Sequence, residues 1–391
     1  MEHSRKQKKA ITLETFVFLI VAGVFFGYLA MKMGIDKMFN TIMNTAHYLL
    51  IDVVFFIMAI AVLAGAFAAL LSEFGVVALI NKIISPIMKP LYNLPGAASI
   101  GMITTYLSDN PAIISLAQDN GFKKYFKEYQ LPTLCNLGTA FGMGLILTTY
   151  MLGLGDGVEY LVPVLIGNIG AIIGSIVSVR IMMRFTKQFY NIETEKADKT
   201  PAIDDINLLR EVRVGNTFER ILDATLEGGK TGVELGLAII PGVVIICTLV
   251  MLFTFGPSGY ENGVAIYTGA KKEGVALFPK IGAFLSPILT PLFGFKSPEA
   301  IAFPITSLGS VGAAMGLVKD FVAKELVGPN EIAVFTSMGM CWSGYLSTHV
   351  GMMDALNVRK LASKAILSHT IGGIIAGISA HYIYLLVALF N

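Results

Sequence analysis

Long apolar runs, separated by short clusters of charge, recur along this chain of 391 residues. Several of these runs reach about 20 residues, the length that a helix needs to cross the hydrocarbon core of a bilayer. Only 14% of the residues are charged, against about 25% in soluble domains. The sequence therefore predicts an all-α polytopic membrane protein embedded in the lipid bilayer.

Seven of the runs are long and regular enough to be full membrane spans. They lie near residues 13–32, 49–72, 131–153, 160–182, 234–256, 331–353 and 364–390. The first run follows a basic N-terminal segment and is too long for the apolar core of a signal peptide. We therefore expect it to be retained as an extra N-terminal span.

The basic residues indicate how these spans are oriented. If the N-terminus is cytoplasmic, the cytoplasmic segments hold 21 of the 29 Lys and Arg residues and the outer segments hold eight. Such a bias agrees with the positive-inside rule. It predicts a multi-pass protein of the cell (inner) membrane with a cytoplasmic N-terminus and an extracytoplasmic C-terminus. The net charge of +2 is too small to indicate a nucleic-acid partner.

Two further apolar stretches, 75–118 and 277–318, are interrupted by proline, glycine and polar residues. Proline removes a backbone donor and kinks a helix. Within a membrane such breaks survive only where protein or a wet cavity satisfies the freed backbone groups. Each stretch is therefore predicted to form an amphipathic helix followed by a re-entrant helical hairpin.

The two interrupted stretches are similar to each other. Residues 85–92 read Ser-Pro-Ile-Met-Lys-Pro-Leu-Tyr, and residues 286–293 read Ser-Pro-Ile-Leu-Thr-Pro-Leu-Phe. At this offset of 201 residues, 11 of the 35 positions from 85 to 119 are identical. Because the predicted topology sends the two hairpins in from opposite sides, the copies are expected to be inverted.

The repeat divides the chain into four predicted parts. These are a cytoplasmic N-terminus with the extra span (1–39), a first repeat (40–182), a cytoplasmic connector (183–216) and a second, inverted repeat (217–391). Inverted repeats with broken helices are the architecture of secondary transporters, whose substrate binds near the midplane. The alternative is that the repeat only stabilises a membrane bundle.

The first hairpin tip carries the candidate binding residues Ser108, Asp109 and Asn110. An acid between apolar runs is costly and usually functional, and the amide of Asn110 can both donate and accept hydrogen bonds. Together they could hold a polar solute or a cation. The alternative is that Ser-Asp-Asn only caps the second helix of the hairpin.

The second tip and the spans after the hairpins supply further candidates. At the second tip, Ser307, Gly309 and Ser310 can expose backbone groups to a ligand, although small residues also serve tight helix packing. In the following spans the candidates are Asn136, Thr139 and Ser337. Such polar residues often form hydrogen bonds between membrane helices instead.

Enzyme signatures are absent from the sequence, which contains no phosphate-binding loop, no Gly-x-Ser-x-Gly and no His-Glu-x-x-His. We therefore expect no catalytic residues, no metal centre and no cofactor. Transport would then depend on an ion gradient, with Na⁺ or H⁺ as the coupling ion.

The paired Ser-Pro-Ile-x-x-Pro-Leu segments, the first tip and the Asn-x-Gly of residues 136–138 resemble the nucleoside recognition (Gate) family. This family includes YjiH-type membrane proteins, spore maturation proteins, the membrane part of ferrous iron transporters and regions of concentrative nucleoside transporters. The resemblance implies inverted repeats with re-entrant hairpins. In the nucleoside transporters the first tip carries a Gln-Thr-Glu run that binds the nucleoside, and the matching place here is Ser108–Asn110.

Three functions are compatible with these features. The leading hypothesis is a secondary-type transporter for a small polar solute such as a nucleoside, a nucleobase or an amino acid-like compound. The second is a divalent metal ion transporter that uses Asp109, Asn110 and Cys135. The third is a non-transporting membrane scaffold resembling the spore maturation proteins. The substrate, the direction of transport and a homo-oligomeric state stay open.

Overall fold

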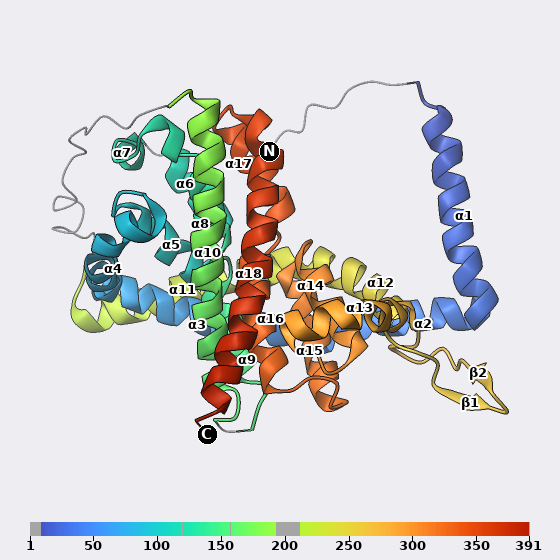
Figure 1. Cartoon of the computed structure of the whole chain (residues 1–391). Helices are drawn as coiled ribbons and strands as arrows, with labels where there is room; N and C mark the ends of the chain where they lie inside the picture. The colour runs from blue at the N-terminus through green and yellow to red at the C-terminus, as the bar shows by residue number, and fades with distance from the viewer. Residues whose placement is uncertain (1–8, 119, 157, 193–211, 391) are drawn as a thin grey trace.

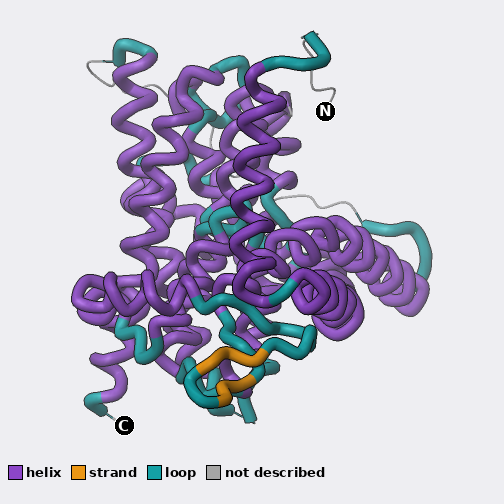
Figure 2. Tube along the Cα trace, turned by 90° about the vertical axis from the view of Figure 1, so that its right-hand side faces the viewer, coloured by secondary structure: helices purple, strands orange, loops and turns teal. Residues whose placement is uncertain are grey.

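The structure is a computed structural model. It describes residues 9–118, 120–156, 158–192 and 212–390. Helices make up nearly all of this part of the chain. Its only strands, β1 (Gly259–Glu261) and β2 (Val264–Ile266), pair as a short antiparallel hairpin. Figure 2 places this hairpin at the same end of the molecule as the C-terminus. The prediction of an all-α polytopic fold is confirmed.

The N-terminal part begins with α1, which stands apart from the other helices in Figure 1. A turn at Gly34, with a φ of 82°, leads into a long helix that includes one π-helical segment. The elements are α1 (Leu13–Met33), α2 (Ile35–Tyr48), the π-helical segment η1 (Leu49–Val54) and α3 (Phe55–Glu73). The predicted extra span is therefore present as α1.

The rest of the chain forms two consecutive series of helices. The first comprises α4 (Val76–Tyr92), α5 (Ala98–Leu107), α6 (Pro111–Gln118), α7 (Asn120–Lys123), η2 (Glu128–Gln130), α8 (Thr133–Thr139), α9 (Gly144–Leu152) and α10 (Leu161–Phe189). The second comprises α11 (Thr217–Pro241), the π-helical η4 (Gly242–Cys247), α12 (Thr248–Thr254), α13 (Leu277–Phe293), η5 (Pro298–Ile301), α14 (Ala302–Ser307), α15 (Val311–Ala323), α16 (Pro329–Cys341), α17 (Tyr345–Ala355), η6 (Arg359–Leu361) and α18 (Ala362–Ala388).

The offset of 201 residues relates the first series to the second from α13 onward. It carries α4 onto α13 at both ends, and the starts of α9 and α10 onto the starts of α17 and α18. It also pairs residues with left-handed backbone conformations. The pairs are Gly75 with Ala276, Asn93 with Gly294 and Met143 with Gly344. Since non-glycine residues seldom adopt positive φ, these matches show that both copies fold with the same turns.

The last helices of the two copies pack against each other in opposite directions. Along α10, Gly170 lies against Ala376 and Ala380, whereas Gly174, one turn later, lies against Gly372. Figure 1 shows α10 ending at the top of the molecule and α18 ending beside the C-terminus at the bottom. Equivalent helices that run antiparallel make the repeat inverted, as the sequence predicts.

The hairpins form where the sequence predicts them. In the first, α5 and α6 are separated by Ser108–Asn110, and in the second, α14 and α15 are separated by 308–310. The arms of each hairpin pack against one another. The amphipathic helices α4 and α13 precede them, each with two internal prolines.

The spans differ from the prediction in three places. Within the described residues, six helices are long and apolar enough to cross a membrane. The expected span at 331–353 is not one of them, because its helix breaks at 342–344. The helices expected at 49–72 and 234–256 begin earlier, at Ile35 and Thr217. Their first turns are amphipathic, and hydropathy alone therefore placed the helix starts too late. Most of the predicted connector, residues 193–211, lies outside the described part of the chain.

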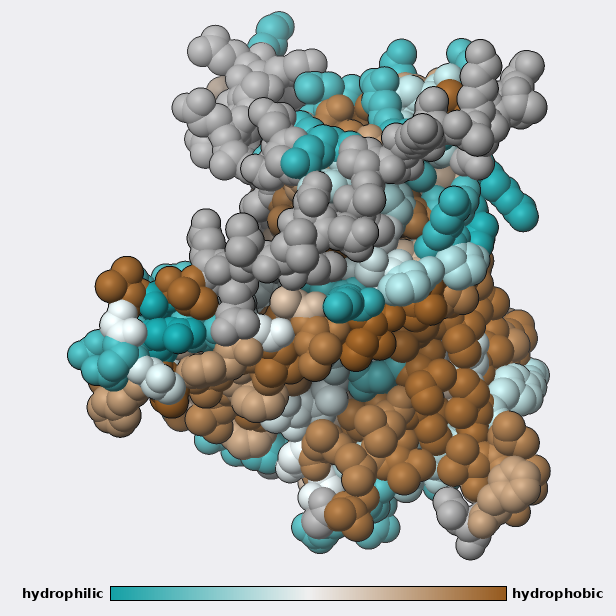
Figure 3. All heavy atoms as spheres, turned by 90° about the vertical axis from the view of Figure 1, so that its left-hand side faces the viewer, coloured by the Kyte–Doolittle hydropathy of each residue, from teal (hydrophilic) through white to brown (hydrophobic). Residues whose placement is uncertain are grey.

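The sides of the molecule are hydrophobic. In Figure 3 a continuous apolar surface covers much of the face seen from the left of Figure 1. Many large apolar side chains are exposed, including Leu63, Phe67 and Leu165 at 71%, 54% and 54%. In water such a surface would favour association, whereas in a bilayer it is the surface that contacts lipid. The chain is a multi-pass membrane protein.

The antiparallel contact between α3 and α11 depends on glycine. A Cβ on Gly228 would lie 2.3 Å from the carbonyl oxygen of Gly65, whereas a Cβ on the neighbouring Gly229 would come no closer than 3.5 Å to Val62. We expect Gly228→Ala to destabilise the protein by about 1–3 kcal/mol through overpacking. Gly229→Ala should be neutral or slightly stabilising, because alanine favours the helix.

Thermal melting of both purified variants checks this prediction. Both substitutions make the same chemical change on adjacent residues, so their difference isolates the backbone contact. Equal melting temperatures for the two variants would contradict the packing that we describe.

Candidate functional site

A polar cavity of about 340 Å³ lies where the two hairpin tips meet. Five parts of the chain contribute to its wall: both tips, the break before α9, the break before α17, and the α11–η4 helix. The lining residues are Asp109, Asn110, Met143, Leu235, Ala238, Ile239, Gly242, Ile246, Gly309, Ser310, Val311, Gly312, Ser343, Gly344, Ser347 and Thr348. The cavity therefore unites the irregular segments of both copies.

Asn110 is the central polar residue of this site. It is 4% exposed, and its side-chain amide donates to the carbonyl oxygen of Ser343 and, at 3.5 Å, to the hydroxyl of Thr348. Its carbonyl oxygen Oδ1 lies against the Cα of Gly142 and has no hydrogen-bond partner. Gly142 and Ser343 are equivalent positions of the two copies, so this side chain links both breaks. An unpaired buried acceptor offers a bond to a ligand.

Asp109 lies beside Asn110 and also lines the cavity. One oxygen of its carboxylate accepts a 2.7 Å hydrogen bond from the backbone N–H of Asn110. None of the ion pairs among the described residues includes Asp109. A carboxylate without a basic partner inside a membrane protein favours a cation or a donor group of a solute.

The second tip contributes mainly backbone groups and one hydroxyl. Ser310 is the N-cap of α15, where its hydroxyl accepts a bond from the N–H of Ala313 at 3.2 Å. Gly309 beside it is exposed to the cavity. The apolar part of the wall comes from Leu235, Ile239 and Ile246. The cavity therefore combines apolar side chains with hydrogen-bonding groups.

A buried histidine fixes the break before α17. His369 of α18 donates from Nε2 to the carbonyl oxygen of Cys341 at 2.5 Å. Because a carbonyl can only accept, Nδ1 of the neutral ring accepts the 2.9 Å bond from the hydroxyl of Ser178. Ser178 in turn accepts from the amide of Asn136 at 3.0 Å. This chain of bonds runs across α8, α10 and α18 and ends at the last residue of α16.

The structure brings together four of the nine predicted site residues. Asp109, Asn110, Gly309 and Ser310 line the cavity. The hydroxyls of the others bond to carbonyls of their own helices: Ser108 to Thr104, Thr139 to Cys135, Ser307 to Pro304 and Ser337 to Val334. Asn136 bonds instead to Ser178 and to the carbonyl oxygen of Ala365. These five residues do not line the cavity, and a role of theirs in binding stays a prediction.

Sequence reasoning did not select the break residues that complete the cavity. Ser343, Gly344, Ser347 and Thr348 line it, as does Met143 of the first copy. The offset of 201 pairs Met143 with Gly344, and both adopt positive φ. Glycines at positions 142, 144 and 344 are the signal in the sequence that could have revealed these breaks.

The described residues were also compared with the ligand sets of metal sites. Among the residues that the structure describes, no group of three or more His, Cys, Asp or Glu side chains is arranged to hold a metal ion. Cys135, considered for a soft metal, is fully buried and is not part of the cavity wall.

Comparisons with known proteins agree with this arrangement. Residues 54–185 match the family described as Nucleoside recognition (Gate), and the resemblance seen in the sequence is thereby confirmed. A comparison with curated proteins finds no match.

Solved structures of the concentrative nucleoside transporter CNTnw match nearly the whole chain. An inward-facing, substrate-bound structure has a TM-score of 0.51 at 17% identity and covers 96% of this chain and 92% of that one. An outward-facing variant has a TM-score of 0.50 at 15% identity, with 96% and 93% covered. At these identities the likeness establishes the fold, an all-α polytopic fold shared with these transporters.

Proposed function

Because residues 54–185 carry the nucleoside recognition (Gate) domain, we propose that this chain is a secondary-type membrane transporter of a small polar solute. The observation that carries the proposal is the cavity formed by both hairpin tips and both helix breaks. In secondary transporters, broken helices of inverted repeats meet at the substrate site. The chain would thus act as a transporter and not as an enzyme.

The cavity wall favours a solute with one flat apolar face and several polar groups. Leu235, Ile239 and Ile246 offer an apolar surface, and Asp109 and Asn110 offer acceptors in the same cavity. A nucleoside or nucleobase combines a ring face with N–H and O–H donors, so this class fits best. An amino acid-like solute would use the same carboxylate and amide groups. A substrate-bound CNTnw structure shares the fold, which supports this choice.

The coupling ion belongs to the same proposal. Asp109 has no basic partner among the described ion pairs, and the Ser343 carbonyl and Thr348 hydroxyl lie within reach of Asn110. Na⁺ would use such oxygen groups as ligands, and H⁺ would bind the carboxylate. Binding measured in sodium and in choline buffers, each at two pH values, distinguishes these ions.

The orientation that we propose has the N-terminus in the cytoplasm and the C-terminus outside. Single cysteines introduced after α18 and into the β1–β2 loop should react with an impermeant thiol reagent in whole cells. Cysteines in the 193–211 connector should react only after the membrane is opened. A C-terminal cysteine protected in intact cells would contradict this topology. The three native cysteines are fully buried, which keeps the background low.

Substitutions at the first tip test the binding site. We expect Asp109→Asn to weaken binding of a donor-rich or cationic solute about tenfold or more, because it removes a half-buried charge that would bond the ligand. Asn110→Ala should weaken binding by about 10- to 100-fold, a loss of about 1.5–3 kcal/mol. Both variants should still fold, because each residue lies at a helix break.

The measurement is ligand affinity for each variant, after a thermal-shift screen of nucleosides, nucleobases and amino acids on the wild type. Asn168→Ala is a matched control, because this amide also lies in the membrane part but belongs to a different cavity. Unchanged affinity in both tip variants would place the site elsewhere. Failure of Asp109→Asn to fold would instead assign that carboxylate a structural role.

A further inference from the structure

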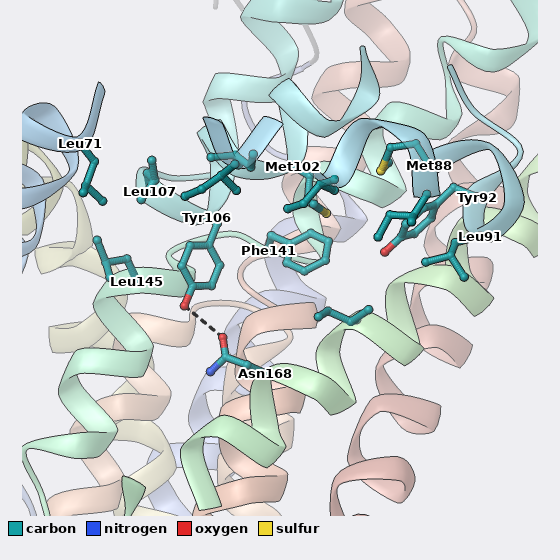
Figure 4. Close-up of a pocket in the computed structure, with 15 residues that line it drawn as sticks. Leu71, Met88, Leu91, Tyr92, Met102, Tyr106, Leu107, Phe141, Leu145 and Asn168 are labelled. Carbon is teal, nitrogen blue, oxygen red and sulfur yellow. Dashed lines mark hydrogen bonds between the residues drawn. The ribbon is translucent and has the colours of Figure 1, made fainter. Parts of the chain in front are cut away.

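A second cavity, of about 410 Å³, lies between α4 and the first arm of the first hairpin. Figure 4 shows its walls: Met88 and Leu91 from α4, Met102 and Tyr106 from α5, Leu71 from α3, and Asn168 from α10. On α4 the lining follows one stripe, with Ile80, Ile84, Ile87 and Leu91 spaced three or four residues apart. This amphipathic helix thus turns one apolar stripe toward the cavity.

The polar groups in this cavity are already satisfied by one another. The hydroxyl of Tyr106 donates to Oδ1 of Asn168 at 3.1 Å, as the dashed line in Figure 4 shows. The amide nitrogen of Asn168 donates to Thr148 at 3.1 Å and to the carbonyl oxygen of Val164 at 2.9 Å. A polar solute would find no free partner there, so the occupant of this cavity must be apolar.

The cavity reaches the lateral surface of the molecule. Ile87 and Ile172, which line it, are 47% and 41% exposed. Because the chain is a multi-pass membrane protein, the solvent at this surface is the hydrocarbon of the bilayer. An acyl chain can therefore enter from the side without crossing a polar layer.

Cationic side chains stand at the α4 edge of the same cavity. Lys89 is exposed and follows Met88, a lining residue. Arg180 of α10 donates from Nε to the carbonyl oxygen of Leu91 at 2.7 Å and also contacts that of Pro90. Lys82 lies two turns before Lys89 on the exposed face of α4. None of the three belongs to an ion pair within the described residues.

The inverted copy provides an internal comparison. The offset of 201 carries Lys82, Lys89 and Arg180 onto Ala283, Thr290 and His381. The second copy therefore has no Lys or Arg at any of these three positions, although the bounds of α13 match those of α4. A cation cluster confined to one copy is not needed by the shared fold. In the proposed orientation it faces the cytoplasmic leaflet, where anionic lipids concentrate.

We propose that this cavity binds the acyl chain of an anionic phospholipid whose phosphate lies between Lys89 and Arg180. The lipid would fill the space between α4 and the first hairpin. The proposal is independent of the transported solute, because its cavity shares no residue with the polar one.

Lipid retention tests the proposal. Purified protein is exchanged into detergent with equal amounts of phosphatidylglycerol and phosphatidylcholine, and the bound lipid is counted by native mass spectrometry. Wild type should retain phosphatidylglycerol with roughly a tenfold preference, because each basic residue near the surface attracts an anionic lipid. Lys82→Gln combined with Lys89→Gln should reduce the preference at least about threefold, with Arg180 as the remaining cation. The matched control Lys280→Gln, which removes a cation from α13, should keep it.

The acyl-chain part needs a separate readout. Ile84→Phe adds volume inside the cavity and should reduce the retention of both lipids. A phosphatidylglycerol with a photoreactive acyl chain should label peptides from α4 and α5 of the wild type. This labelling tests acyl-chain binding even if Ile84→Phe does not fold. Equal retention of both lipids by wild type, or no label on α4 and α5, would overturn the proposal.

Discussion

Gly142→Ala is expected to weaken ligand binding about 10- to 100-fold while the protein still folds. A Cβ at this position would lie 1.9 Å from Oδ1 of Asn110, so the Asn110 side chain must leave its place between the two breaks. It would lose its bonds to Ser343 and Thr348 and withdraw its acceptor from the ligand. The loss of this buried acceptor from the ligand corresponds to about 10- to 100-fold in affinity. Folding should survive, because the end of a side chain moves and not the backbone.

The measurement is ligand affinity with melting temperature as the folding control. Gly153→Ala is the matched control, since its Cβ would meet only ordinary contacts at 3.5 Å. A double-mutant cycle sharpens the test. In an Asn110→Ala background the clash is gone, and Gly142→Ala should then add almost nothing. Additive losses would mean that Gly142 acts through something other than Asn110.

His369→Leu is expected to lower stability by about 2–6 kcal/mol, because the Cys341 carbonyl loses its donor and the Ser178 hydroxyl loses its acceptor, at about 1–3 kcal/mol each. Leucine has a similar size but bonds neither the carbonyl oxygen of Cys341 nor the hydroxyl of Ser178. The break at 342–344 would lose its anchor on α18. Ligand affinity should fall as well, although His369 does not line the cavity.

Thermal melting and ligand affinity of three variants check this positioning role. His369→Gln should recover part of both losses, since an amide can donate to Cys341 and accept from Ser178. The exposed His47 provides the control His47→Leu, which should change neither quantity. If His369→Leu lowered stability but left affinity unchanged at a temperature well below melting, the histidine would be a packing residue only.

Much of the fold could be predicted because its signals are local or repeated. Hydropathy identifies α1, α18 and the start of α10 within a few residues, and prolines reveal the two interrupted stretches. The offset of 201 predicts an inverted repeat from eleven identities, and it describes helix bounds far beyond the aligned segment. The π-helical segments η1 and η4 could not be predicted from the sequence, because their residues are as apolar as those of the helices around them.

The site was harder to predict than the fold, and the reason lies in how polar residues behave in membranes. Ser307, Ser337 and Thr139 looked like candidates because of their polarity, but each hydroxyl bonds to a carbonyl three or four residues back. Such a bond is open to any Ser or Thr on a helix. Asp109 and Asn110 were identifiable because they combine polarity with a helix break. Ser343 and Gly344 share this property, but no proline marks their break.

Counterflow in proteoliposomes tests the central claim most directly. Vesicles containing the purified protein are loaded with an unlabelled nucleoside, nucleobase or amino acid, and uptake of the same radiolabelled compound is followed. We predict that at least one compound accumulates with wild type and with Gly153→Ala, and that accumulation is lost with Gly142→Ala. A compound that binds the protein but never accumulates above empty vesicles, or equal uptake by Gly142→Ala and wild type, would contradict the account of a transporter with its site at the hairpin tips.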